Sequence, residues 1–319
     1  MPGALALVAA ALIRWANLLA LAGVMGGLVT ELIVLPHRGA ELDVARRRVG
    51  RMTIAALLLL AAASLADLVA RAQTMTGGGI AATLTALPSV LGRTHYGLIW
   101  RLRAVALGLL GILCSTRWRV ARMAALGTML GVVFTFALSG HAADWGDSTP
   151  AALVDWGHAV AASAWAGSLL CSWWCVFRER QASLPRADLV AITRRFSRLA
   201  GWCVCVIVLS GLANGYVELA TIPALWTSAY GRVLIAKLLL VLGALALGGA
   251  NRYRVLPSLA GTDSSDHDSA RALLARYVAC EVMLVIAVFG CTALLGQLPP
   301  PRHGGSHGDM AHVTASAAL

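Results

Sequence analysis

Two histidines and three aspartates share one connection between apolar segments, and their side chains could bind a metal ion. His141 and His158 lie in the stretch 136–167, FALSGHAADWGDSTPAALVDWGHAVAASAWAG, which contains no lysine or arginine. Neutral imidazole binds copper, zinc, iron and nickel. Nearby carboxylates attract cations and can orient a ligating imidazole. The carboxylates of this connection belong to Asp144, Asp147 and Asp155. We favour metal binding over the alternative, in which His141 caps a helix and His158 occupies a polar first turn.

Further ligand types occur at two other places. His95 precedes an apolar segment, and the C-terminal stretch PPPRHGGSHGDMAHVTASAAL combines three histidines with a methionine, whose thioether favours Cu(I). The candidate ligands of this stretch are His303, His307, Met310 and His312. Such a glycine-rich tail suits transient capture of copper, although tails of this composition are often only disordered.

The cysteines offer softer ligands. All seven fall inside or at the ends of apolar runs, which argues against a disulfide framework. Two close pairs, Cys171 with Cys175 and Cys203 with Cys205, could bind Cu(I). Cysteine is also a small residue used in helix packing, and packing is the interpretation we favour for these thiols.

The composition indicates the kind of fold that positions these residues. The chain has 319 residues, 59% of them hydrophobic and only 13% charged, and apolar runs of membrane-spanning length recur. These features predict an all-α polytopic membrane protein in contact with lipid. The net charge of +11 is better explained by arginine-rich cytoplasmic loops than by nucleic-acid binding. The first apolar run lacks a clear cleavage site, so we expect a retained span rather than a signal peptide.

We predict eight transmembrane helices, with a short interfacial helix as a further possibility within 72–94. The expected spans are 11–35, 52–72, 95–115, 122–140, 155–177, 199–217, 230–250 and 277–297. Alternate connections carry 18 of the 26 basic residues, whereas 141–154 carries none. By the positive-inside rule, both termini and the histidine-bearing connection face the periplasm of a bacterial inner membrane.

The chain also repeats itself. Three segments of the first half resemble segments of the second, in the same order. The pairs are RRRVGRMTIAALLLLAAASLAD (46–67) with TRRFSRLAGWCVCVIVLSGLAN (193–214), LPSVLGRTHYGLIWRLR (87–103) with IPALWTSAYGRVLIAK (222–237), and RWANLLALAGVMGG (14–27) with DWGHAVAASAWAGS (155–168). We expect two tandem four-helix repeats in parallel orientation, 1–140 and 141–298, followed by a flexible tail, 299–319. Chance similarity among Ala/Leu-rich helices is the alternative.

Several polar residues lie within the apolar runs, where charge is costly, so they should face the bundle interior and pair. They are Asp67, Asn214, Arg103, Lys237 and Glu281. The duplication aligns Asp67 with Asn214, Tyr96 with Tyr230, and Arg103 with Lys237. These side chains could line a path or make structural hydrogen bonds, and the two basic residues could instead snorkel outward beside the tyrosines.

A series of motifs then resembles the copper-resistance protein D family. They are SGHAA, DWGHAVAASAWAG, SGLANG, SAYGRVLIAKLLLVLGALALGGANRYR and ARYVACEVMLVIAVFG, all within 139–297. The resemblance implies an inner-membrane component of copper handling that moves copper from periplasm to cytoplasm with a small periplasmic copper-binding partner, CopC. It also implies that His141 and His158 are the residues that matter most for metal. The first half carries Asn17 where the second carries His158, so the two halves are not equivalent metal sites.

These observations predict a copper permease for Cu(I) or Cu(II). The chain has no G-x-x-x-x-G-K-[ST] loop, so no nucleotide is expected as an energy source. The sequence shows no nucleophile paired with a general base, so we do not expect an enzyme. Two alternatives stay open: a copper sensor or scaffold without flux, and an electron carrier with haem bound by histidines on neighbouring spans.

Overall fold

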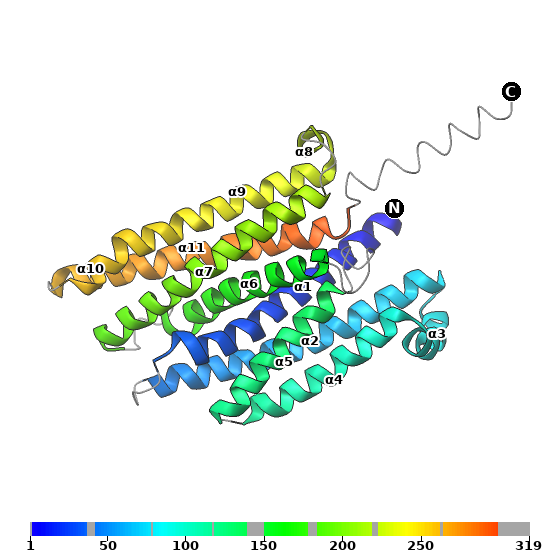
Figure 1. The fold of residues 1–319 in the computed structure, drawn as a ribbon, viewed down its shortest axis with the longest axis horizontal. Coiled ribbons are helices and arrows are strands. Elements are labelled where there is room, and N and C mark those ends of the chain that lie inside the picture. Colours follow the sequence, from blue (N-terminus) through cyan, green and yellow to red (C-terminus); the bar gives the residue numbers. More distant parts are fainter. Residues whose placement is uncertain are drawn as a thin grey trace.

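Long helices running side by side make up the protein, as the computed structural model shows (Figure 1). The structure describes residues 2–36, 42–77, 79–116, 118–138, 150–177, 184–218, 223–261 and 264–298. Within these ranges there is no strand, and eight helices are long and apolar enough to cross a membrane. The predictions of an all-α architecture and of eight spans are therefore confirmed.

The spanning helices are of unequal length, and three of them continue into a π-helical turn. In chain order the elements are α1 (Pro2–Val29), η1 (Thr30–Val34), α2 (Asp43–Thr76), α3 (Ile80–Arg93), α4 (His95–Ser115), α5 (Arg119–Ala137), α6 (Pro150–Ser172), η4 (Trp173–Phe177), α7 (Arg186–Glu218), α8 (Ala224–Thr227), α9 (Ala229–Ala250), η5 (Asn251–Val255), α10 (Leu256–Ala260) and α11 (Ser264–Leu295).

Several helices begin well before the predicted spans, and α2 and α7 are the arginine-rich cases. The expected spans 52–72 and 199–217 are only parts of α2 and α7, which begin at Asp43 and Arg186. Both early segments are rich in arginine, which is a good helix former, and no proline interrupts them. The helices therefore continue past the apolar stretch. We call the end of the bundle where α2 and α7 begin the arginine end.

The opposite end of the bundle carries two matching corners, α3 before α4 and α8 before α9 (Figure 1). The helix α3 confirms the short helix expected within 72–94. At the first corner the Thr94 hydroxyl accepts a hydrogen bond from the Gly97 N–H at 2.9 Å, and at the second Ser228 does the same for Gly231 at 2.9 Å. A Cβ on either glycine would overlap backbone carbonyls of the short helix before it. We call this the α3–α8 end.

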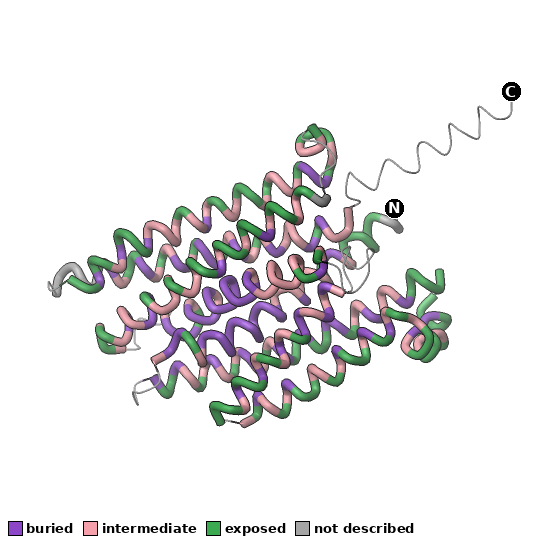
Figure 2. The backbone as a smooth tube through the Cα atoms, viewed as in Figure 1, coloured by how far each residue is buried: buried purple, intermediate pink, exposed green. Residues whose placement is uncertain are grey.

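The helices α1 and α6 form the centre of the bundle. Helix α1 packs against α2, α6 and α11, and α6 packs against α7 and α5. Figure 2 shows that buried residues are concentrated along these two helices. Small and aliphatic side chains make up this part of the core, including Ala22, Met25, Leu28 and Leu169.

The two central helices cross at a pair of glycines. A Cβ on Gly26 would overlap the backbone of Gly167, and a Cβ on Gly167 would overlap the Ala22 carbonyl and lie 2.9 Å from the Gly26 Cα. Small residues are what allow two helix backbones to approach this closely in a membrane. The predicted duplication aligns Gly26 with Gly167.

Each central helix is also hydrogen-bonded to the last span of the other half. The Trp15 indole N–H of α1 donates to the Ile286 carbonyl of α11 at 3.1 Å. The Trp156 indole N–H of α6 donates to the Leu130 carbonyl of α5, also at 3.1 Å. The duplication aligns these two tryptophans. They therefore act as cross-links between the halves rather than only as anchors at the lipid interface.

Arg103 does not snorkel outward. It is 1% exposed, and its guanidinium donates to the Thr135 hydroxyl at 2.9 Å and to the Thr135 carbonyl at 2.8 Å. Its Cζ also stands 3.8 Å from the centre of the Phe136 ring. The alternative that placed Arg103 toward the interface is therefore wrong, and this arginine ties α4 to α5 inside the bundle.

Candidate metal site at the α3–α8 end

His158 is held in place by a hydroxyl from the neighbouring helix. It lies in the first third of α6, and its Nδ1 is 2.9 Å from the Ser210 Oγ of α7. The Ser210 hydroxyl also lies 2.5 Å from the Val206 carbonyl oxygen of its own helix. The imidazole is thus fixed at one nitrogen, between two tightly packed helices.

The tautomer of His158 decides which imidazole nitrogen is available. A serine hydroxyl has one proton, and the Val206 carbonyl lies within reach of it. In the tautomer in which Nδ1 donates to Ser210, the lone pair is on Nε2. A metal-binding histidine is typically oriented in this way, by a partner on its other nitrogen.

Charged and amide groups of three helices surround this histidine. Asp155 precedes His158 by almost one turn of α6, and its Oδ1 lies 3.4 Å from the Asn214 Nδ2 of α7. Lys237 of α9 lies near enough to act electrostatically on the imidazole.

In the first half, Asn17 occupies the position aligned with His158. It is buried, and its side-chain amide is hydrogen-bonded on both its N–H and its oxygen. Asn17 is 3% exposed, its amide donates to the Ala63 carbonyl at 3.0 Å, and it accepts from the Ser64 hydroxyl at 3.1 Å. The duplication places Gly211 where the first half has Ser64. A Cβ on Gly211 would stand 3.6 Å from the His158 Cε1, so the absence of a larger side chain leaves room for the imidazole.

Asp67 likewise belongs to a satisfied structural network. It accepts from the Tyr96 hydroxyl at 3.0 Å and is 3.3 Å from the Arg71 Nε. The Arg71 Cζ stands 5.0 Å from the centre of the Tyr96 ring. This carboxylate is already neutralised, which leaves it little capacity to bind a cation. In the second half, Tyr230 is buried at the α9 corner.

The other predicted ligands are not brought together. His95 is exposed at the start of α4. Among the described residues, no group of three or more His, Cys, Asp or Glu side chains is arranged to hold a metal ion. Several candidates lie outside the described residues, so their part in a site stays a prediction. These are His141, Asp144, Asp147, His303, His307, Met310 and His312.

The thiols of one predicted cysteine pair are in contact, and those of the other pair are not. Cys171 and Cys175, in α6 and η4, are buried, and their thiols lie within hydrogen-bonding distance of each other. The Thr30 hydroxyl of η1 also lies beside Cys171. By contrast, Cys203 is buried and Cys205 is exposed on α7, so these two side chains diverge.

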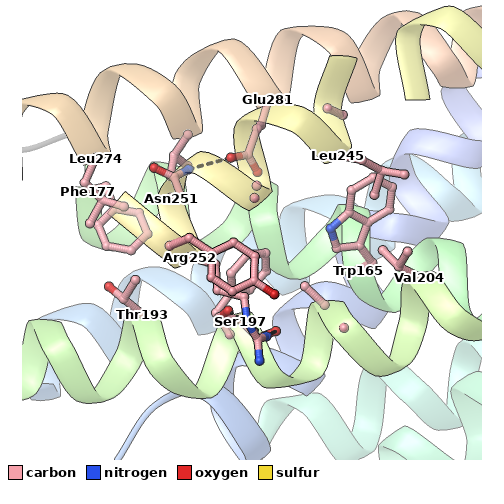
Figure 3. A pocket seen from close by; sticks show the side chains of 18 residues that line it. Trp165, Phe177, Thr193, Ser197, Val204, Leu245, Asn251, Arg252, Leu274 and Glu281 are labelled. Atoms are coloured by element: carbon pink, nitrogen blue, oxygen red, sulfur yellow. Dashed lines mark hydrogen bonds between the residues drawn. The ribbon is translucent and has the colours of Figure 1, made fainter. Parts of the chain in front are cut away.

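A cavity of about 340 Å³, large enough for a small ligand, lies between α6, α7, α9 and α11 near the arginine end (Figure 3). Its wall is mainly apolar, and Glu281 of α11 and Asn251 of η5 are joined by a hydrogen bond within it. Glu281 was expected from the sequence, whereas Asn251, Ser210 and Gly211 were not. The duplication held a signal for Gly211, because its counterpart Ser64 differs there.

Comparison with protein families accounts for most of the chain. Residues 4–148 match the N-terminal domain of copper resistance protein D-like proteins, and residues 190–295 match copper resistance protein D. The chain belongs to the copper resistance protein D family. The resemblance found in the motifs is thereby confirmed.

Two curated relatives of this family member are membrane or transport proteins by name. The copper transport protein CutJ of Bacillus subtilis (strain 168) is 27% identical over 270 residues, which cover 80% of this chain and 47% of CutJ. The inner membrane protein YebZ of Escherichia coli (strain K12) is 28% identical over 146 residues, covering 45% of this chain and 47% of YebZ. The chain thus spans about half the length of the curated relatives it matches. No solved structure matches it.

Proposed function

We propose that this copper resistance protein D family member is a multi-pass inner-membrane protein that carries copper from the periplasm toward the cytoplasm. The observation that supports this most directly is His158. Its Nδ1 is bonded to Ser210, which in the Nδ1-protonated tautomer leaves the Nε2 lone pair for a metal ion, and Asp155 lies three residues before it on the same helix. Imidazole nitrogen is a suitable ligand for copper in either oxidation state. His141 would complete the entry site.

The proposed direction depends on the arginines. Those at the starts of α2 and α7 and on η5 lie at one end of the bundle, and the positive-inside rule assigns that end to the cytoplasm. The α3–α8 end, with His158, would then face the periplasm together with both termini. A periplasmic copper-binding partner of the CopC kind would deliver copper there, as the family resemblance implies.

We further propose that the two halves, 1–140 and 141–298, are tandem repeats related by a pseudo-two-fold axis along the membrane normal. Three pairs of matching contacts support this: the Gly26–Gly167 crossing, the Trp15 and Trp156 cross-links, and the Thr94 and Ser228 corners. Transport sites in repeat proteins tend to lie where the halves meet. The helix α6 lies at that interface.

Helix α6 would also offer the exit ligands. His158 and Cys171 lie on this one helix, about 20 Å apart along its axis at 1.5 Å per residue. Copper that leaves imidazole for the Cys171–Cys175 thiols would move to softer ligands, which favour Cu(I). The residues Asn214 and Lys237 border the beginning of such a path.

Copper uptake into proteoliposomes of defined orientation tests the proposal. The most informative variant is His158→Asn, because it installs the residue of the first half and removes the ligand with little change in volume. We expect time-dependent copper accumulation with the wild-type protein and its loss in this variant. His267→Ala serves as the control, because it removes a histidine from the connection predicted to face the cytoplasm.

Two other results would overturn the transport proposal. Copper that binds to the wild-type protein but never enters the vesicle lumen would indicate a sensor or scaffold. A Soret band in the purified protein would indicate a haem-binding electron carrier.

A further inference from the structure

The cavity at the arginine end contains a buried carboxyl group that the copper site does not use. Glu281 is 2% exposed, and its side chain and that of Asn251 point toward one another at one side of the cavity (Figure 3). The Asn251 Nδ2 donates to the Glu281 Oε1 at 2.5 Å. Most of the surrounding wall is apolar or aromatic, including Trp165, Phe177 and Val278.

The hydrogen bonds between these two residues are incomplete when Glu281 is ionised. The Asn251 Oδ1 is buried and has no donor. A carboxylate has only acceptor oxygens, whereas a carboxylic acid adds one O–H donor. An amide offers one acceptor and an N–H donor, which are complementary to the acid. The neutral acid can therefore satisfy an oxygen that the carboxylate leaves unsatisfied.

No cation among the lining residues is paired with Glu281. The other lining side chains that can carry charge are Arg252 and Tyr253, both on η5; those from α6, η4, α7 and α9, and the others from α11, are not titratable. The Arg252 Nη1 donates to Ser197, at 3.0 Å to the carbonyl and 3.1 Å to the hydroxyl. The nearby Arg194 and Arg198 of α7 line a smaller neighbouring cavity. An unpaired carboxylate is strongly disfavoured in such a buried place.

The cavity is large enough, and polar enough at one side, to hold water. A water molecule occupies about 30 Å³ of liquid volume and needs two to four polar partners. The Asn251 Oδ1, the Glu281 carboxyl and the Ser197 hydroxyl can provide them. Water there would connect Glu281 to the arginine end.

We propose that Glu281 is a proton-exchange site: it takes a proton from cavity water to form a carboxylic acid bonded to Asn251, and it returns that proton to water when it ionises. The exchange is R–COO⁻ plus H₃O⁺ giving R–COOH plus H₂O, so charge and atoms balance without another reactant. Residues of this kind inside membranes are typical of proton relays in transporters.

Proton exchange at Glu281 could affect the copper route through α11. Five residues beyond Glu281, the Ile286 carbonyl accepts the Trp15 hydrogen bond from central helix α1. Asn251 follows α9, which carries Lys237 beside His158. This coupling to copper rests on the proposed function, whereas the proton site itself does not.

Infrared difference spectroscopy of the purified, copper-free protein tests the proton site. We expect a pH-dependent C=O stretch of a protonated acid that shifts in D₂O, disappears in Glu281→Gln and changes frequency in Asn251→Leu. The control is Glu31→Gln, which removes a carboxylate that faces Arg122 at 3.4 Å and should leave the band in place. A band that persists unchanged in Glu281→Gln overturns the proposal.

Copper flux under an imposed pH gradient tests the coupling separately. We expect the wild-type rate to depend on the gradient and to lose that dependence with a protonophore. Glu281→Gln should transport copper at a rate independent of the gradient. Equal gradient dependence in the two proteins overturns the coupling. If the wild-type protein moves no copper, the proposed function fails, while the infrared experiment still decides the proton site.

Discussion

Gly26 of α1 and Gly167 of α6 touch backbone to backbone at the centre of the bundle, and neither has room for a Cβ. The contact joins aligned residues of the two halves, which is what a two-fold axis between them would require. It also closes the interface between the central helices at mid-bundle. On the proposed route, copper passing along α6 would have to travel beside this crossing or wait for it to open.

The crossing predicts a large effect for a very small change. We expect Gly26→Ala to destabilise the protein by about 1–3 kcal/mol, because overpacking forces backbone shifts. Thermal unfolding in detergent measures this. Gly131→Ala is the matched control, since a Cβ there meets nothing within 4 Å. Equal stability of the two variants would show that α1 and α6 can move apart at the crossing without loss of stability.

Ser210 should act on copper through His158. Ser210→Ala removes the acceptor that fixes Nδ1, and loss of such a partner typically lowers metal affinity about 10- to 100-fold. Equilibrium competition with a copper chelator measures the affinity. Ser163→Ala is the control, because the Ser163 hydroxyl bonds only to the Val160 carbonyl of its own helix. Unchanged affinity in Ser210→Ala would separate His158 from copper binding.

Asp67 and Asp155 should differ in function although both lie toward the α3–α8 end. Asp155→Asn removes negative charge beside His158, so copper affinity should fall and depend less on ionic strength. Asp67→Asn breaks the contact with Arg71 and should lower the melting temperature while leaving copper affinity unchanged. Titration at low and high salt distinguishes these outcomes, and the reverse pattern would place the metal in the first half.

Arg103 makes the α4–α5 contact sensitive to one hydroxyl. Thr135→Val deletes an acceptor for a buried guanidinium, and a hydrogen bond to a charged group contributes about 1.5–3 kcal/mol. We expect a loss of stability of that order in chemical unfolding. Thr128→Val, which deletes an exposed hydroxyl bonded to its own helix, should have little effect. A neutral result for Thr135→Val would mean that the Phe136 ring and the backbone carbonyl suffice.

The thiol pairs give opposite predictions. The double variant Cys171→Ser/Cys175→Ser should bind one Cu(I) fewer than the wild-type protein, because two adjacent thiols can ligate one ion. The variant Cys203→Ser/Cys205→Ser should retain the full number, since Cys205 is exposed and diverges from Cys203. Stoichiometry under reducing conditions measures both. The same loss in both variants would argue for general effects of removing sulfur.

The sequence was sufficient for the class of fold because apolar runs of spanning length have few other structures available to them in a membrane. It was insufficient for helix ends, since α2 and α7 continue through arginine-rich segments that hydropathy alone assigns to loops. The aligned pair Asn17 and His158 indicated from the sequence alone that the two halves differ. The hydroxyl on Ser210 and the space beside Gly211 could not be predicted, because they depend on the rotation of α7 against α6.

The thiol contact could be predicted from the sequence, whereas the contact inside the cavity could not. Cys171 and Cys175 are separated by a helical turn, so the sequence indicated their proximity, whereas Cys203 and Cys205 point to different sides of α7. Asn251 and Glu281 are far apart in the chain, and only the π-helical turn after α9 brings the amide against α11. Contacts of this kind require the three-dimensional structure.

The length of α2 has a consequence for how the protein sits in its bilayer. Its 34 residues extend about 51 Å at 1.5 Å per residue, whereas the hydrocarbon layer is about 30 Å thick. The overhang carries Arg46, Arg47, Arg48 and Arg51, and the start of α7 carries a comparable set. Guanidinium groups bind lipid phosphates in pairs of hydrogen bonds. These contacts would fix the positions of α2 and α7 along the membrane normal. The imidazole of His158 would then stay at a constant distance below the opposite membrane surface.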